Sequence, residues 1–381
     1  MAINISQQPQ ELARSGNALT YTFTSTQTNQ PNFAFIIDVY KDGVIHSEHR
    51  VYPENGTYGR FDLSEIAEYE TTKPNIPSSV YVDAQNYADF YIVAKEFYGV
   101  NPVVVGTSTS NTSLFFKSRQ GIYENFYYAD YIPSVVGASL MTYFNETLLH
   151  VNELFYLYAL KLPADPYVLI SYRTISGLEA HVHNQSLVNH DCLGVKLDYL
   201  FLQANYNPIP PVTWEEITSI VITITNGTEY YNDYTIKLNH STTCIKPTRI
   251  HWLNKIGGME SYSFTKPTRE EQKTNVQSFE TSDGQWFGSF YGISNEDTGN
   301  ATFQTEGKKY IELESGFISE EVQRVIYDNL YTSPYILVEW EERLIRVSRD
   351  NVTVSYNNNK LDQLFNMKIK VNIENFKSAI V

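Results

Sequence analysis

Apolar and polar residues alternate along much of this chain, and this period of two constrains its fold more than any other feature. An early run alternates Leu19, Tyr21 and Phe23 with threonines, and a late run alternates Met367 and Ile369 with lysines. Successive side chains of a β-strand point to opposite faces of its sheet, so each run predicts a strand with one dry and one wet face. The sequence therefore predicts a mainly β protein.

Short turn signals separate several of these runs. Lys41-Asp42-Gly43 lies between two strand-like runs at 33–39 and 44–51, and Asn226-Gly227 follows alternating isoleucines at 220–224. Asp-Gly and Asn-Gly readily adopt the positive φ angles that two-residue hairpin turns need. We therefore expect a β-hairpin at each place.

Helical periodicity is scarce. One or two capped turns are expected after Asp62, and a longer helix is expected near 319–331. Ser319 is placed to cap this longer helix, acidic residues occupy its first turn, and Ser333-Pro334 ends it. Many short strands with few helices are typical of β-sandwiches and small barrels.

Stretches rich in Pro, Gly and small polar residues suggest domain boundaries at 106–113 and 207–211, whereas the similar stretch 71–79 is expected to be a long loop inside the first domain. We predict two tandem β-sandwich-like domains, at 1–118 and 119–245. A smaller α+β C-terminal domain is predicted at 246–381, rich in strands and with one helix near 319–331.

The charge is unevenly distributed along the 381 residues, whose net charge is −15. Residues 1–245 hold 12 Lys+Arg and 24 Asp+Glu, a balance of −12, and the rest hold 16 and 19, a balance of −3. A nucleic-acid surface needs clustered positive charge. We therefore expect no specific nucleic-acid partner.

Features of export and of membrane insertion are missing from the sequence. The N-terminus has no basic region followed by an apolar one, and no apolar run approaches the length of a spanning helix. We expect no signal peptide and no membrane partner. Cys192 and Cys244 are expected to be free thiols of a protein assembled in the cytosol.

The best metal-binding candidates are His181, His183, His190 and Cys192. Residues two apart share a strand face, so a hairpin could gather these side chains into a tetrahedral site. Their spacing matches no standard zinc module, and ordinary histidines on two polar hairpin strands are the favoured interpretation. We expect no metal and no cofactor.

Paired carboxylates are the best catalytic candidates. Glu339 and Glu341 are expected on one strand face, and Glu215 and Glu216 are adjacent. A glycosidase needs two carboxyls facing each other across a cleft, and a solvated acidic face is favoured instead. The sequence also has no nucleophile elbow and no phosphate-binding loop. We therefore predict no catalytic residue and no enzymatic activity.

The one locally basic stretch, at 246–273, contains the candidate interface. Gly257-Gly258 is expected to form a tight turn with positive φ, because it lacks the Lys-Ser/Thr of a phosphate loop. The basic side chains are expected to pair with the acidic first half or with an acidic neighbouring subunit. The predicted subunit-interface residues are Arg249, Lys255, Gly257 and Gly258.

A family resemblance is centred on the same stretch. Residues 244–264 place a cysteine, an Arg-x-His strand at Arg249, the run Leu-Asn-Lys-Ile-Gly-Gly at 253–258, and an aromatic strand that ends at Phe264. The runs 21–62 and 315–334 fit the same pattern. Together they resemble virion structural proteins of crAss-like and related Bacteroidota tailed phages.

This resemblance implies a ring or stabilisation protein of the phage neck or tail, located in the virion and assembled in the host cytoplasm. The implied partners are the chain itself in a cyclic homo-oligomer of twelvefold symmetry, the portal, and other neck or tail ring proteins. The resemblance supplies no catalytic residues. The alternative is a tail-borne β-sandwich module that binds host surface glycan through Tyr and Trp side chains.

Overall fold

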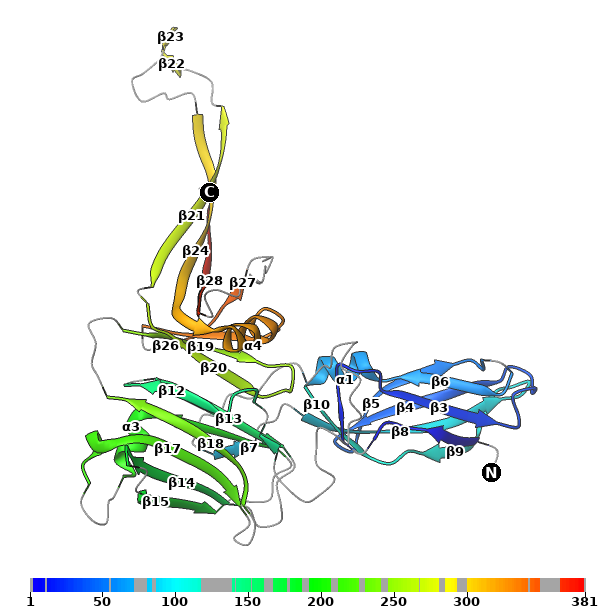
Figure 1. Cartoon of the computed structure of the whole chain (residues 1–381). Helices are drawn as coiled ribbons and strands as arrows, with labels where there is room; N and C mark the ends of the chain where they lie inside the picture. The colour runs from blue at the N-terminus through cyan, green and yellow to red at the C-terminus, as the bar shows by residue number, and fades with distance from the viewer. Residues whose placement is uncertain are drawn as a thin grey trace. The chain divides into compact units, whose positions relative to one another are not determined.

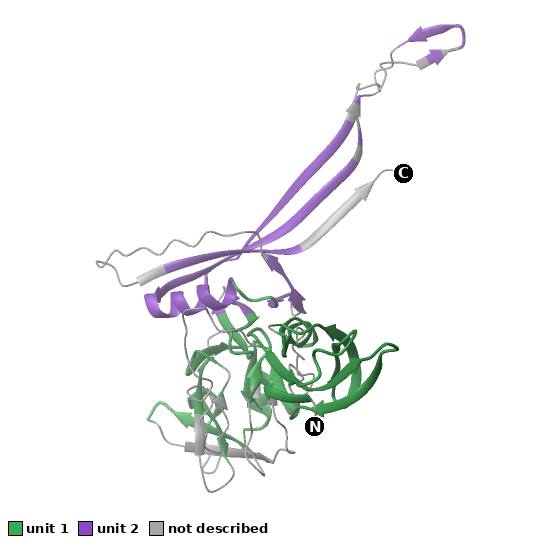
Figure 2. Ribbon diagram, turned by 90° about the vertical axis from the view of Figure 1, so that its right-hand side faces the viewer, with its two compact units in different colours: residues 1–241, 251–262, 332–334 green, residues 242–250, 263–331, 335–381 purple. Residues whose placement is uncertain are grey.

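The computed structural model describes residues 3–10, 12–54, 56–71, 81–83, 87–117, 139–140, 142–151, 153–160, 167–176, 179–186, 192–206, 212–225, 230–240, 246–266, 268–280, 285–292, 300–341, 343–349 and 364–379. It divides into two compact units, coloured separately in Figure 2. Unit 1 comprises 1–241, 251–262 and 332–334, and unit 2 comprises 242–250, 263–331 and 335–381.

Unit 1 begins with a β-sandwich (Figure 1). Its strands are β1 (Ile3–Gln7), β2 (Leu12–Arg14), β3 (Thr20–Ser25), β4 (Ala34–Lys41), β5 (Val44–Val51), β6 (Tyr58–Asp62), β8 (Tyr87–Tyr98), β9 (Val103–Thr109) and β10 (Ser113–Phe116). The smaller sheet has the order β1-β3-β6, and the larger has β2-β10-β8-β4-β5 with β9 also on β8. Tyr21 and Phe23 from the smaller sheet pack with Phe35 and Phe90 from the larger to form one core.

The predicted hairpin at Asp42-Gly43 is confirmed. Strands β4 and β5 pair antiparallel with Lys41 opposite Val44, and Asp42 and Gly43 have φ angles of 49° and 78°. Two residues with positive φ give the turn whose twist matches that of the flanking strands. The tract at 106–113, in contrast, is not a linker, because its residues contribute to β9 and β10.

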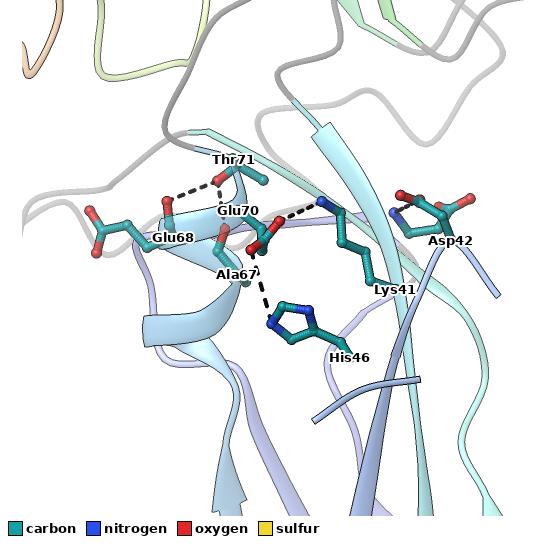
Figure 3. A network of polar contacts seen from close by, with 8 residues as sticks. Lys41, Asp42, His46, Ala67, Glu68, Glu70 and Thr71 are labelled. Atoms are coloured by element: carbon teal, nitrogen blue, oxygen red, sulfur yellow. Dashed lines mark hydrogen bonds and ion pairs between the residues drawn. The ribbon is translucent and has the colours of Figure 1, made fainter. Parts of the chain in front are cut away.

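Helix α1 (Ser64–Glu70) is the short helix expected after Asp62. Asp62 Oδ1 accepts a hydrogen bond from the Ser64 amide (3.0 Å). At the other end of the helix, Glu70 forms an ion pair with Lys41 (2.5 Å) beside the β4–β5 turn (Figure 3). The helix is thus tied to the larger sheet at its C-terminal end.

A second sandwich occupies the rest of unit 1. Its strands are β7 (Tyr81–Asp83), β11 (Ser139–Leu140), β12 (Glu146–His150), β13 (Leu154–Leu160), β14 (Tyr167–Thr174), β15 (Glu179–Ser186), β16 (Cys192–Asp198), β17 (Ile217–Thr225) and β18 (Tyr230–Asn239). One sheet has the order β11-β13-β16-β7 and the other β12-β18-β17-β14-β15. Phe155 and Leu197 from the first sheet and Ile170 and Ile222 from the second share one core.

The expected pairing of the strands around Asn226-Gly227 is confirmed, because β17 and β18 are antiparallel neighbours. The turn itself lies outside the described residues. Helix α3 (Tyr199–Ala204) and the 3-10 turn η1 (Trp214–Glu216) lie between β16 and β17 in the sequence.

Strand β7 belongs to a different sandwich from the strands that flank it in the sequence. This strand lies within the predicted N-terminal domain, yet it pairs with β16, Val82 lying opposite Gly194. The predicted boundaries at 118/119 and 245/246 fall on or beside residues outside the described part. The three-domain division therefore stays a prediction.

Unit 2 is dominated by long strands. Strands β21 (Arg269–Glu280), β24 (Asn300–Ser319) and β28 (Leu364–Ala379) form an antiparallel sheet in the order β21-β24-β28-β27, with β27 spanning Ser348–Arg349. The short strands β22 (Gln285–Phe287) and β23 (Phe290–Gly292) form a separate hairpin. A further sheet has the order β20-β19-β25-β26, built from β19 (Thr248–Leu253), β20 (Met259–Phe264), β25 (Ile336–Trp340) and β26 (Arg343–Arg346); its residues 251–253 and 259–262 are counted with unit 1.

Two predictions for unit 2 are confirmed. Helix α4 (Glu320–Leu330) is capped by Ser319, whose Oγ accepts a hydrogen bond from the Val322 amide (3.4 Å). On β28, Met367 and Ile369 are buried while Lys368 between them is exposed. The chain is therefore mainly β, with two tandem β-sandwiches and an α+β C-terminal part.

Gly59 offers a test of the first core. A Cβ atom at this position would lie 2.7 Å from Phe35 Cδ2 and 2.8 Å from Phe23 Cδ2, and both rings are fully buried. Because an added methyl group would overlap two fully buried rings, we expect Gly59→Ala to lower the free energy of unfolding by about 1–3 kcal/mol. Urea denaturation measures this change.

The matched control is Arg60→Ala, because Arg60 is the exposed neighbour of Gly59 on β6. It should stay within about 0.5 kcal/mol of the parent chain. Equal stabilities for Gly59→Ala and the parent chain would contradict the described packing of this core.

Candidate assembly surface

The predicted interface residues lie on or between two paired strands, β19 and β20. Gly257 has a φ of 101°, which confirms the predicted positive-φ turn. Asn254 holds the turn, because its Oδ1 accepts hydrogen bonds from the amides of Ile256 (3.0 Å), Gly257 (2.9 Å) and Gly258 (3.0 Å). The Gly pair thus lies in a buried turn.

Arg249 does not lie on a surface. Its side chain is 0% exposed, and its Nη1 donates a hydrogen bond to Ser263 Oγ (2.7 Å). A side chain in this position cannot face a neighbouring subunit, so the expectation for Arg249 as a surface cation is corrected. Lys255 is half-buried at the turn, and an interface role for it stays a prediction.

Within unit 1, the buried carboxylate of Glu260 joins the same turn to a segment that is distant in the sequence. Glu260 Oε1 accepts hydrogen bonds from Thr142 Oγ1 (2.8 Å) and from the amides of Tyr143 (2.6 Å) and Phe144 (3.2 Å). Its Oε2 lies 3.5 Å from Asn254 Nδ2. Burial raises the pKa of the Glu260 carboxyl, and these hydrogen bonds act in the opposite direction.

The structure separates the candidate metal ligands. Strand β15, which carries His181 and His183, pairs with β14, whereas β16, which begins at Cys192, lies in the other sheet. The two strands therefore do not form the expected hairpin. His190 and Cys244 lie outside the described residues. Within the described part, no group of three or more His, Cys, Asp or Glu side chains could hold a metal ion.

The candidate carboxylate pairs are also placed differently from the expectation. Glu339 lies on β25, but Glu341 lies in the turn that follows, with a φ of 50°, so the two do not share a strand face. Glu215 and Glu216 lie in the turn η1 and are exposed. No helix among the described residues is long and apolar enough to cross a membrane.

The longest strands of unit 2, β21, β24 and β28, form one sheet, which we call the arm (Figure 2). Its distal part, 274–280 with 300–306, contains no buried side chain among those described. Val276 on β21 is 54% exposed. The core side chains of β24, Tyr310, Ile311 and Leu313, all lie nearer its C-terminal end. The side chains that the structure describes therefore give the distal arm no core of its own.

Ion pairs tie the strands together nearer that core. Lys309 Nζ lies 2.9 Å from Glu270 Oε2, and Lys370 donates a hydrogen bond to Glu271. This hydrogen bond lowers the pKa of the Glu271 carboxyl. Lys370 Nζ also lies 4.8 Å from the centre of the Tyr310 ring. Such exposed pairs contribute little stability, so they do not replace a core.

The distal arm lacks the positive charges found in the rest of the arm. Between Lys273 and Lys308 the chain has no Lys or Arg, and its acidic residues there are Glu280, Asp283, Glu296, Asp297 and Glu306. Residues 274–279, Thr-Asn-Val-Gln-Ser-Phe, carry no charge at all.

The hairpin β22–β23 (Figure 1) is rich in aromatic residues. Trp286 pairs across the strands with Tyr291, their ring centres lying 5.5 Å apart, and Phe287 lies opposite Phe290. Trp286 and Phe290 are 71% and 65% exposed. Rigid, exposed aromatic side chains are typical anchors of binding surfaces.

Sequence reasoning missed the arm. The stretch 269–319 contains β-branched and aromatic residues in an order that predicts strands, but alternation does not reveal whether a second layer covers them. The absence of cations from 274 to 307 was the available signal.

No protein-family model and no curated protein matches the chain. Solved structures that it matches include Ig tandem domains of titin (9% identity, TM-score 0.24), titin domains z1z2 in complex with telethonin (11%, 0.17) and fibronectin(III)-like modules of Clostridium thermocellum CbhA (9%, 0.16). Each alignment covers 63% of this chain, and 98%, 97% and 94% of those chains respectively. At these TM-scores the matches carry no argument about function.

Changing pH tests the hydrogen bonds that join the buried Glu260 carboxyl to residues 142–144. Because its pKa is raised in the folded chain, the folded state holds this proton more tightly than the unfolded state. Deprotonation of this carboxyl therefore lowers the free energy of unfolding as pH rises through the raised pKa. We expect the free energy of unfolding to fall less in Glu260→Gln than in the parent chain as the pH rises from mildly acidic to neutral. Urea denaturation at each pH measures this difference.

The exposed Glu280 provides the control, since Glu280→Gln should follow the parent chain's pH dependence. Parallel curves for Glu260→Gln and the parent chain would show that Glu260 does not titrate as described.

Proposed function

We propose that this chain is a non-enzymatic structural subunit of a tailed-phage particle, forming a ring in the neck or tail below the portal. The observation that carries the proposal is the exposed distal arm. A ribbon of two or three strands without a hydrophobic face or a covering layer is marginally stable in water. A chain that maintains such a ribbon needs another molecule to cover it.

A ring supplies that molecule. Each subunit of a closed ring meets two neighbours through the same heterologous contact, so one arm per subunit is covered by a neighbour. The resemblance of 244–264 and of the two ends of the chain to phage virion proteins supports a neck or tail location. The twelvefold symmetry and the portal as a partner follow from that resemblance.

The charge distribution supports the same proposal. The net charge of −15 and the cation-free distal arm disfavour adhesion to a nucleic acid. A component that surrounds passing DNA without binding it needs this property.

The glycan-binding alternative also has an observation in its favour. Trp286 and Tyr291 expose aromatic surface on one small hairpin, and sugar rings stack on such surfaces. This function would need neither a ring nor a covered arm.

Shortening the arm tests the proposal. Thr274 lies opposite Gly307, so replacing 275–306 by Asn-Gly closes the hairpin at that rung. We expect the parent chain, alone or with the portal, to form a cyclic species of about a dozen copies, and the shortened chain to stay monomeric. Native mass spectrometry across salt concentrations measures both.

The control is Trp286→Ala with Tyr291→Ala, which leaves the arm's strands intact. This variant should still assemble. A parent chain that remains monomeric with the portal, or a shortened chain that assembles normally, contradicts the proposal. Saturable binding of host glycan that the control variant loses would favour the alternative.

A further inference from the structure

The arm has two strand edges that no described strand pairs with. Among the described strands, β21 pairs only with β24, so no described strand covers its outer edge over twelve residues. On the other side, β27 pairs with β28 only at Asn372 and Val371. Beyond Asn372, the outer edge of β28 is open among the described residues.

An open edge presents a row of backbone N–H and C=O groups that can pair with another strand. Proteins usually protect such edges with charged residues or proline. The part of β21 nearer the core has this protection, in Arg269, Glu270, Glu271 and Lys273. Residues 274–279 have neither charge nor proline. The distal edge of β21 is therefore the part suited to pairing.

The two open edges lie at the same level along β24. Val276 of β21 and Ser378 of β28 both lie opposite Thr305 of β24, on its two sides. Each open distal edge also has the same length, 274–280 on one side and 373–379 on the other. One copy therefore offers two edges of equal length that a second copy can occupy; the edge of β21 is uncharged over 274–279, and that of β28 carries one residue of each sign, Glu374 and Lys377.

We propose that the outer edge of β21 in one copy pairs with the outer edge of β28 in the next, so that the arms join into one continuous β-wall. Both strands are antiparallel to β24, so they run in the same direction and the junction is parallel. Head-to-tail pairing leaves one edge open at each end unless the ring closes, and closure removes every edge.

This inference rests on the proposed ring and names the contact that builds it. A two-fold contact between two β21 strands is the competing arrangement, and it would leave the β28 edge open in both copies.

Site-directed crosslinking tests the junction. In a Cys192→Ala, Cys244→Ala background, Val276→Cys is combined with Ser378→Cys, and each is also made alone. The assembled protein is treated with a bis-maleimide that spans neighbouring strands with a few residues of stagger. We expect a ladder of covalent multimers from the double variant and only monomers from each single variant, on denaturing gels.

Crosslinked dimers from Val276→Cys alone would identify the two-fold contact and overturn the proposal. The absence of multimers from the double variant would also overturn it, provided that native mass shows the ring intact. That result leaves the proposed function standing. If native mass shows no multimer, both the junction and the proposed function fail. Circular dichroism and thermal unfolding confirm that all variants fold.

Discussion

The backbone of a β-strand carries hydrogen-bonding groups on both of its edges, and each buried or regular strand must pair them or expose them to water. In the two sandwiches of unit 1, strands also bury side chains between facing sheets, as Phe155 and Ile170 do. In the described part of the chain, β21 and β28 of the arm pair their inner edges with β24, and no facing sheet covers the distal part. The proposed assembly follows from this one unmet requirement.

The sequence was a good guide wherever a local pattern decided the structure. Asp42-Gly43 determined a turn because both residues tolerate positive φ, and Ser319 began helix α4 because its hydroxyl caps an exposed amide. Alternation on β28 identified its buried face. These features depend on residues only a few positions apart, so a single sequence contains the information.

Sequence reasoning failed where distant segments decide the environment. The basic stretch at 246–273 was interpreted as a surface, but Arg249 is buried on β19, with Ser263 of β20 as a hydrogen-bond partner. Nothing local distinguishes a buried arginine from an exposed one. The same limit explains the misplacement of β15 and β16 in one hairpin, and the assignment of β7 to the N-terminal domain. The carboxyl of Glu260 has its hydrogen-bond partners only because residues 142–144, far away in the sequence, contact it.

The central claim is that the distal arm is stabilised by a neighbouring subunit and not by its own chain. Backbone hydrogen exchange, followed by mass spectrometry in the monomeric and assembled protein, tests this claim most directly. We predict rapid exchange at 274–280 in the monomer and strong protection of the same amides after assembly, with the core of β24 near Ile311 protected in both. Equal protection of 274–280 in the two states would contradict the account.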